Sequence, residues 1–91
     1  MDDTRLKKLK FRAWHRGFRE ADLILGPFAD SHAASLTPAQ LDAFERLLEE
    51  PDHDIYGWIV GRAPAPPEHD GEVMEMLRAF QPAARGGDHG A

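Results

Sequence analysis

Apolar residues recur at spacings of three and four along most of the chain, and no stretch alternates between apolar and polar residues with period two. The first pattern forms an apolar stripe on an α-helix, whereas a half-buried strand requires the second. We therefore predict an all-α fold. A chain of 91 residues can bury one modest core, so we expect one domain, a small five-helix bundle. Four apolar residues should be buried together in it: Leu25, Phe44, Leu48 and Trp58.

Glycine and capping residues should divide the first half of the chain into three helices. We expect the first two at about Thr4–His15 and Phe18–His32. They should be separated at Gly17, because glycine favours the left-handed conformation that ends helices. Thr37 should start a third helix with a capping box and a proline in its first turn, and Pro51 should end it.

A short fourth helix is expected directly after this proline. Asp52 or Asp54 should cap it, and Gly61 should end it. We prefer this capping role to a metal-ligand cluster of the two aspartates with His53, because acids at a helix start complement the helix dipole.

The last predicted helix is flanked by two segments that should not be helical. Residues 63–67 read Ala-Pro-Ala-Pro-Pro and should form a polyproline connector. Asp70 should then cap the fifth helix, and Pro82 should stop it. Residues 83–91 offer little to bury and are predicted to be disordered, so the helical domain should comprise residues 1–82.

Residue types that carry catalysis or bind metals are not grouped along the chain. No cysteine is present, and the five histidines form no pair at helical ligand spacing: His15, His32, His53, His69 and His89. Ser31 and Ser35 lack a convincing base, and no Gly-x-Gly-x-x-Gly or P-loop pattern could hold a dinucleotide. We therefore predict that the chain is not an enzyme, with no catalytic residue, no metal ligand and no stably bound cofactor.

Charge is distributed unevenly. Residues 1–20 contain seven Lys and Arg against three acidic residues, whereas residues 21–91 contain four against thirteen. Such a dipole can steer association with a partner. The basic end, with Phe11 and Trp14, leaves nucleic-acid binding as a weaker alternative, although an overall charge of −5 would repel a phosphate backbone. The lack of cysteine and of a long apolar run indicates a reducing compartment and no membrane insertion.

The most informative segment is Arg16-Gly17-Phe18-Arg19-Glu20, followed by Asp22. With Gly17 at the start of a helix, Arg16 and Glu20 should come close on one side of the turn. The missing Cβ would let another backbone approach, which would make a flat, charged docking spot. The alternative is that Gly17 only ends a helix and Glu20 is an acid favoured in any first turn.

Three segments together carry a specific pattern, with Arg-Gly-x-x-Glu in the first: Trp14–Leu23, Leu25–Phe28 and Leu47–Trp58. In this order and spacing they resemble the succinate dehydrogenase assembly factor family, called SdhE in bacteria. The resemblance covers about Arg5 to Gly61. It implies a five-helix fold, and a location in the bacterial cytoplasm, which we prefer, or in the mitochondrial matrix.

The resemblance also implies a function. Members promote covalent attachment of FAD to the flavoprotein subunit of succinate dehydrogenase, or sometimes of fumarate reductase. The partner would carry the FAD, and this chain would be monomeric when free. The family's docking motif corresponds to Arg16, Gly17 and Glu20, and we add Arg19 and Asp22 to the expected partner-binding residues.

Departures from the family pattern leave the partner preference open. His15 stands where an arginine is common, Phe18 where methionine is frequent, and Ala21 where a larger aliphatic residue is usual. Family members have also been labelled antitoxins. A regulatory protein-binding module is therefore the alternative function.

Overall fold

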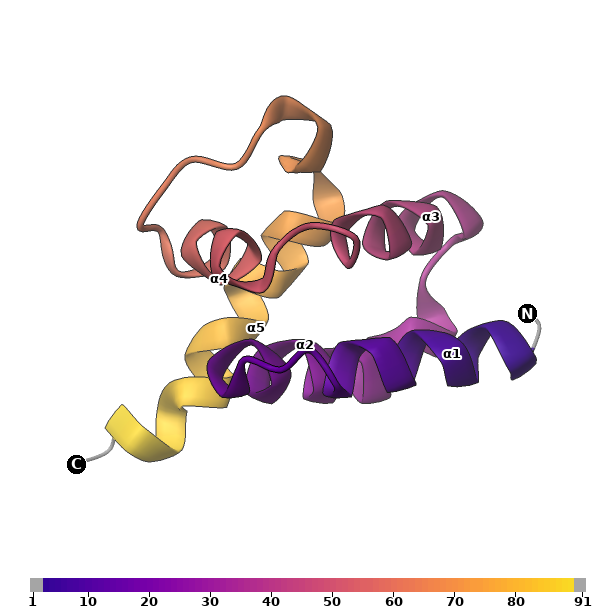
Figure 1. Cartoon of the computed structure of the whole chain (residues 1–91), viewed down its shortest axis with the longest axis horizontal. Coiled ribbons are helices and arrows are strands. Elements are labelled where there is room, and N and C mark those ends of the chain that lie inside the picture. Colours follow the sequence, from indigo (N-terminus) through magenta and orange to yellow (C-terminus); the bar gives the residue numbers. More distant parts are fainter. Residues whose placement is uncertain (1–2, 90–91) are drawn as a thin grey trace.

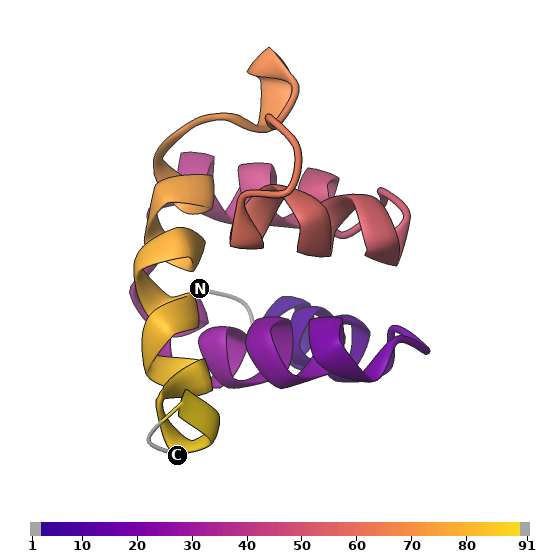
Figure 2. The same ribbon diagram turned by 90° about the vertical axis from the view of Figure 1, so that its left-hand side faces the viewer.

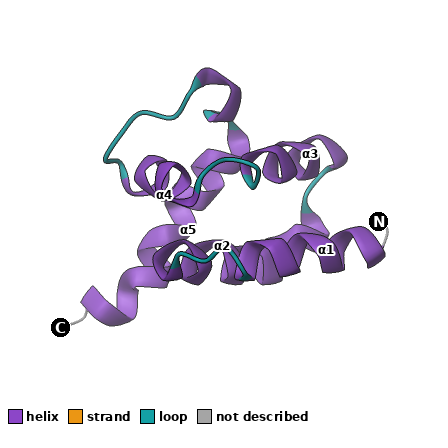
Figure 3. Cartoon of the chain, viewed as in Figure 1, coloured by secondary structure: helices purple, strands orange, loops and turns teal. Residues whose placement is uncertain are grey.

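Five α-helices and two short 3₁₀-helices make up the chain in the computed structural model, which describes the backbone of residues 3–89 and the side chains of residues 4–80. In order these are α1 (Asp3–Trp14), α2 (Arg19–His32), η1 (Ala33–Ser35), α3 (Pro38–Leu47), α4 (Asp52–Val60), η2 (Pro67–His69) and α5 (Glu72–His89). No strand occurs in the described backbone (Figure 3). The predicted all-α, five-helix fold is confirmed.

The helices form two layers, and α5 covers one side of both. α1 and α2 lie side by side as one layer, and α3 and α4 form the other (Figures 1 and 2). α5 runs along the edge of both layers and contacts α2, α3 and α4. The turn between α1 and α2 and the loop between α3 and α4 therefore lie on the side of the molecule opposite α5 (Figure 2).

The core fills the space between these layers. Phe28 of α2 packs edge-to-face against Phe44 of α3, with ring centroids 5.3 Å apart, and against Phe80 of α5, at 5.6 Å. The four side chains that were predicted to be buried together all belong to this core: Leu25, Phe44, Leu48 and Trp58. Met74 of α5 is also fully buried.

Local signals correctly predicted several helix ends. Thr37 accepts a hydrogen bond from the Gln40 backbone while the Gln40 side chain accepts one from the Thr37 backbone, which is the predicted capping box. Gly17 and Gly61 have φ angles of +88° and +85°, the left-handed conformation expected where α1 and α4 end.

The predicted aspartate caps are wrong. The residue before α4 is Pro51, without a side-chain cap, and Asp52 is the first helical residue, whose carboxylate accepts a bond from Arg16 instead. At the next start Asp70 lies one residue too early to cap α5, and its carboxylate accepts from Arg78 at 3.2 Å. In both cases a charged arginine donor is a stronger partner for a carboxylate than a backbone N–H.

The predicted stop at Pro82 is also wrong, because α5 continues to His89. Proline removes one helical hydrogen bond and tends to kink a helix, but it does not always end one, and Pro27 lies inside α2 in the same way. The domain boundary at residue 82 and the disorder of residues 83–91 stay predictions, since the side chains from 81 onward, and residues 90 and 91 entirely, lie outside the described residues. Among the described residues, no helix combines the length and the apolar character needed to cross a membrane.

Candidate protein-docking site

The turn between α1 and α2 exposes its glycine. Gly17 adopts a φ of +88°, and a Cβ built on it would meet no atom within 4 Å. The residue is exposed, so its open face is available to another molecule. A side chain at this position would be strained by the backbone and would project into the space that a partner's backbone could occupy.

Arg16 is held inside the molecule, in contrast to the expected open docking spot. Its side chain is only 11% exposed. Arg16 Nε donates to Asp52 Oδ1 at 2.6 Å, and Nη2 donates to the Glu50 carbonyl oxygen at 2.9 Å. The backbone N–H of Arg16 donates to Asp22 Oδ1 at 2.8 Å. The structure therefore separates the expected binding residues into two groups, and Arg16 and Asp22 belong to the internal one.

Arg19 and Glu20 form the outer group together with Gly17. Both charged side chains are exposed on the first turn of α2. Within the part of the chain that the structure describes, neither makes an ion pair or side-chain hydrogen bond. Their charges remain free to interact with a partner.

Exposed apolar side chains lie on the same two helices. Phe11 is 63% exposed, Trp14 37% and Leu23 49%, and these are the large exposed hydrophobic residues of the described side chains. Phe11 stacks on His15, with ring centroids 4.1 Å apart. Leu23 was not identified from the sequence as a surface residue. Its position was a signal for exposure, because it lies off the helix face that carries the buried residues Ala21, Leu25 and Phe28.

Trp14 fixes the packing of α1 on α2. A Cβ added at Gly26 would overlap the six-membered ring of Trp14, so the indole lies directly on the α2 backbone. Trp14 Nε1 also donates to Asp30 Oδ2 at 3.1 Å. Glycine at this position therefore permits a close approach of the two helices. This contact holds the exposed turn at the end of a well-packed pair of helices.

A second cluster of polar side chains lies where the η2 segment meets the end of α3. One ligand atom each from Glu50, Glu68 and His69 lies within 4.8 Å of the others. His69 Nε2 is 2.8 Å from a Glu50 oxygen and 3.7 Å from a Glu68 oxygen, and the buried imidazole stacks on Trp58 at 5.6 Å. Imidazole and carboxylates are suitable cation ligands, but the hydrogen bond to Glu50 already accounts for the buried histidine. Sequence spacing could not reveal the cluster, because Glu50 and His69 are 19 residues apart.

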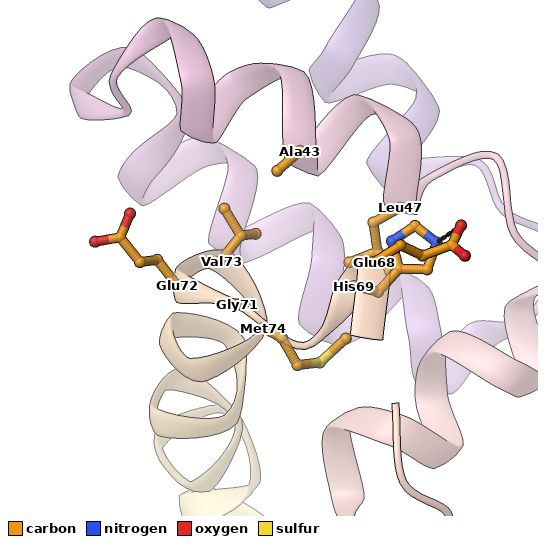
Figure 4. Close-up of a pocket in the computed structure, with 8 residues that line it drawn as sticks. All are labelled: Ala43, Leu47, Glu68, His69, Gly71, Glu72, Val73 and Met74. Atoms are coloured by element: carbon orange, nitrogen blue, oxygen red, sulfur yellow. Dashed lines mark ion pairs between the residues drawn. The ribbon is translucent and has the colours of Figure 1, made fainter. Parts of the chain in front are cut away.

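A small hollow adjoins His69. It has a volume of about 50 Å³ and lies between α3 and the start of α5, with Ala43, Leu47 and Val73 among its lining residues (Figure 4). Small-molecule sites typically occupy roughly 300–1,000 Å³, so this hollow is too small for a flavin.

The described chain is small and helical, and its unpaired charges and exposed apolar side chains gather on two helices around an open turn. These are the features of a small helical binding protein. Comparison with known protein families makes this class specific. The family described as the flavinator of succinate dehydrogenase matches residues 7–81. The chain belongs to this family.

Curated relatives come from bacteria and from eukaryotes. The FAD assembly factor SdhE of Acetobacter pasteurianus is 36% identical over 84 residues, which cover 92% of this chain and 77% of that protein. Mitochondrial succinate dehydrogenase assembly factor 2 of Dictyostelium discoideum is 40% identical over 72 residues, 79% of this chain and 51% of that protein. The protein of the same name from Danio rerio is 36% identical over 80 residues, 86% and 51% of the two chains. This chain thus spans about half the length of these mitochondrial relatives. The comparisons give no support to the antitoxin or nucleic-acid alternatives.

Proposed function

We propose that the chain is an assembly factor that binds the flavoprotein subunit of succinate dehydrogenase, or of fumarate reductase, and promotes covalent attachment of FAD to it. The observation that carries the proposal is the family match over residues 7–81, together with the names of the relatives. The relatives named above come from bacteria and mitochondria, which supports a place in the bacterial cytoplasm or the mitochondrial matrix.

The surface proposed for docking is centred on the α1–α2 turn. Gly17 offers an open face for a partner backbone, and Arg19 and Glu20 offer exposed charges that form no ion pair among the described residues. Exposed Trp14 and Leu23 lie on the same pair of helices and would bury apolar area in the complex. A charged surface with apolar side chains beside it suits a protein partner better than a phosphate backbone.

The covalent chemistry is assigned to the partner. In this mechanism the flavoprotein holds the FAD and supplies the residue that becomes linked to it, while this chain binds the subunit and holds its FAD site in a geometry suited to attachment. Orientation of reacting groups can lower a barrier by up to roughly 7–11 kcal/mol. The mechanism needs no catalytic residue and no cofactor bound by this chain, and a monomer is sufficient for it.

The docking surface is tested in cells that lack their own factor. Gly17→Arg and Glu20→Ala should abolish restoration of covalent flavin, because the first blocks the open face and the second removes an unpaired charge. The measurement is in-gel fluorescence of the denatured flavoprotein subunit, since only covalently bound flavin survives denaturation.

The chain offers a matched control for each variant. Gly61→Arg introduces the same side chain at a glycine with nearly the same φ, +85°, and equally open surroundings. Glu75→Ala removes another exposed acid from a first helical turn, on α5. Both controls should restore flavin fluorescence as the unmodified chain does. If Gly17→Arg and Glu20→Ala restore it equally well while folded, the docking surface lies elsewhere.

A further inference from the structure

Arg16 connects the α1–α2 turn to the start of α4 and the loop before it, which are 34 to 36 residues away in the sequence. Its backbone N–H bonds to Asp22 in α2, while its guanidinium bonds to Asp52 in α4 and to the Glu50 carbonyl in the α3–α4 loop. The turn and the loop lie on the same side of the molecule, away from α5 (Figure 2). Arg16 thus links the two helix layers at the end that α5 leaves open.

The guanidinium is suited to this internal role. Nε and Nη2 point to two different acceptors, at 2.6 and 2.9 Å, which requires the fixed fork of an arginine. A lysine would keep the positive charge but could not reproduce both directions. With only 11% of its side chain exposed, Arg16 offers little surface to a partner.

We infer that Arg16 is a positioning residue rather than a contact residue in docking. The bonds to Asp52 and to the α3–α4 loop fix the turn, so that Gly17 and Glu20 present one defined surface. Asp52 has the same role from the other side, although it is 36 residues away in the sequence. This inference rests on the proposed function, because the surface that Arg16 positions is the proposed docking surface.

The two possible roles of Arg16 predict opposite results. If its charge contacted the partner directly, Arg16→Lys would largely preserve binding, and Asp52→Asn would release the guanidinium and leave binding unchanged or stronger. If Arg16 positions the turn, both substitutions should weaken binding similarly. We expect about a tenfold loss of affinity for each, the equivalent of one hydrogen bond to a charged group.

The experiment measures the affinity of the full chain for the purified flavoprotein subunit, by calorimetry well below the melting temperature of each variant. Asp54→Asn is the matched control, because Asp54 is an exposed acid in the same first turn of α4 with no bond to Arg16. It should bind within about twofold of the unmodified chain, since surface substitutions away from a contact have small effects. Loss of stability alone would not change the affinity of chains that are fully folded at the measuring temperature.

Amide NMR spectra supply an independent readout of the turn. Asp52→Asn should shift the amide signals of Arg16 and Gly17, whereas Asp54→Asn should leave them in place. Equal affinity of Asp52→Asn and the unmodified chain would overturn the positioning role and leave the proposed function intact. If the unmodified chain does not bind the flavoprotein at all, the proposed function is wrong and the positioning role falls with it.

Discussion

At the scale of single residues, two glycines in helices have opposite packing. Gly26 of α2 lies beneath the Trp14 ring, so that an added Cβ would overlap it. Gly57 of α4 is also buried, yet an added Cβ would come no closer than 4.0 Å to its nearest neighbour, Arg62. The sequence showed both as glycines inside predicted helices. It could not show which one permits a close helix contact, because that depends on the packing partner.

The two glycines therefore give a matched prediction. Gly26→Ala should displace Trp14, break its bond to Asp30 and cost about 1–3 kcal/mol, as overpacking does. Gly57→Ala should be neutral or stabilise the fold by up to about 1 kcal/mol, because alanine is the better helix former. Urea unfolding measures both free energies, and the indole N–H signal of Trp14 reports its displacement. Equal stability of the two variants would contradict this packing.

At the scale of helices, features that depend on residues close in the sequence could be predicted, whereas contacts between residues distant in the sequence could not. The capping box at Thr37 and the helix ends at Gly17 and Gly61 could be predicted, because each depends on residues within a few positions. Asp52 was expected to cap its own helix, and its actual partner, Arg16, could not be identified from spacing. The same limit applies to the candidate site: Gly17 and Glu20 are exposed, as a docking spot requires, but the internal bonds of Arg16 could not be predicted.

A second ion pair between distant elements has a predictable pH dependence. Arg5 of α1 donates to both carboxylate oxygens of Glu45 in α3, at 2.9 and 2.7 Å. These bonds lower the pKa of Glu45 below its ordinary value of 4.5, although partial burial acts in the opposite direction. Because the pKa is lower in the folded state, the stabilisation is fully present above pH 4.5 and is lost as the pH falls through the folded-state pKa.

Arg5→Gln should therefore lower the melting temperature at neutral pH, and the difference from the unmodified chain should shrink between about pH 5 and pH 3. Arg46→Gln is the control, since Arg46 is exposed on α3 and forms no ion pair among the described side chains. Its melting difference should stay small over the same range. A difference for Arg5→Gln that persists unchanged at the acid end would show that the ion pair is not its cause.

At the scale of the whole molecule, the two sides are built differently. α5 closes the helix layers on one side and completes the core through Val73, Met74 and Leu77. On the opposite side the α1–α2 turn is open, and the basic residues of the chain are concentrated in its first twenty positions. A basic α1 beside the turn would favour approach to an acidic region of a partner surface. In the proposed function, this open side is the one that docks.

If this chain promotes covalent attachment of FAD by binding the flavoprotein subunit, it should do so with purified components alone. The experiment combines apo-flavoprotein subunit, FAD and increasing amounts of the chain, and measures in-gel flavin fluorescence after denaturation. Covalent flavin per subunit should form faster as the chain is added and should saturate when every subunit is bound. The same rate with and without the chain would contradict the proposed function.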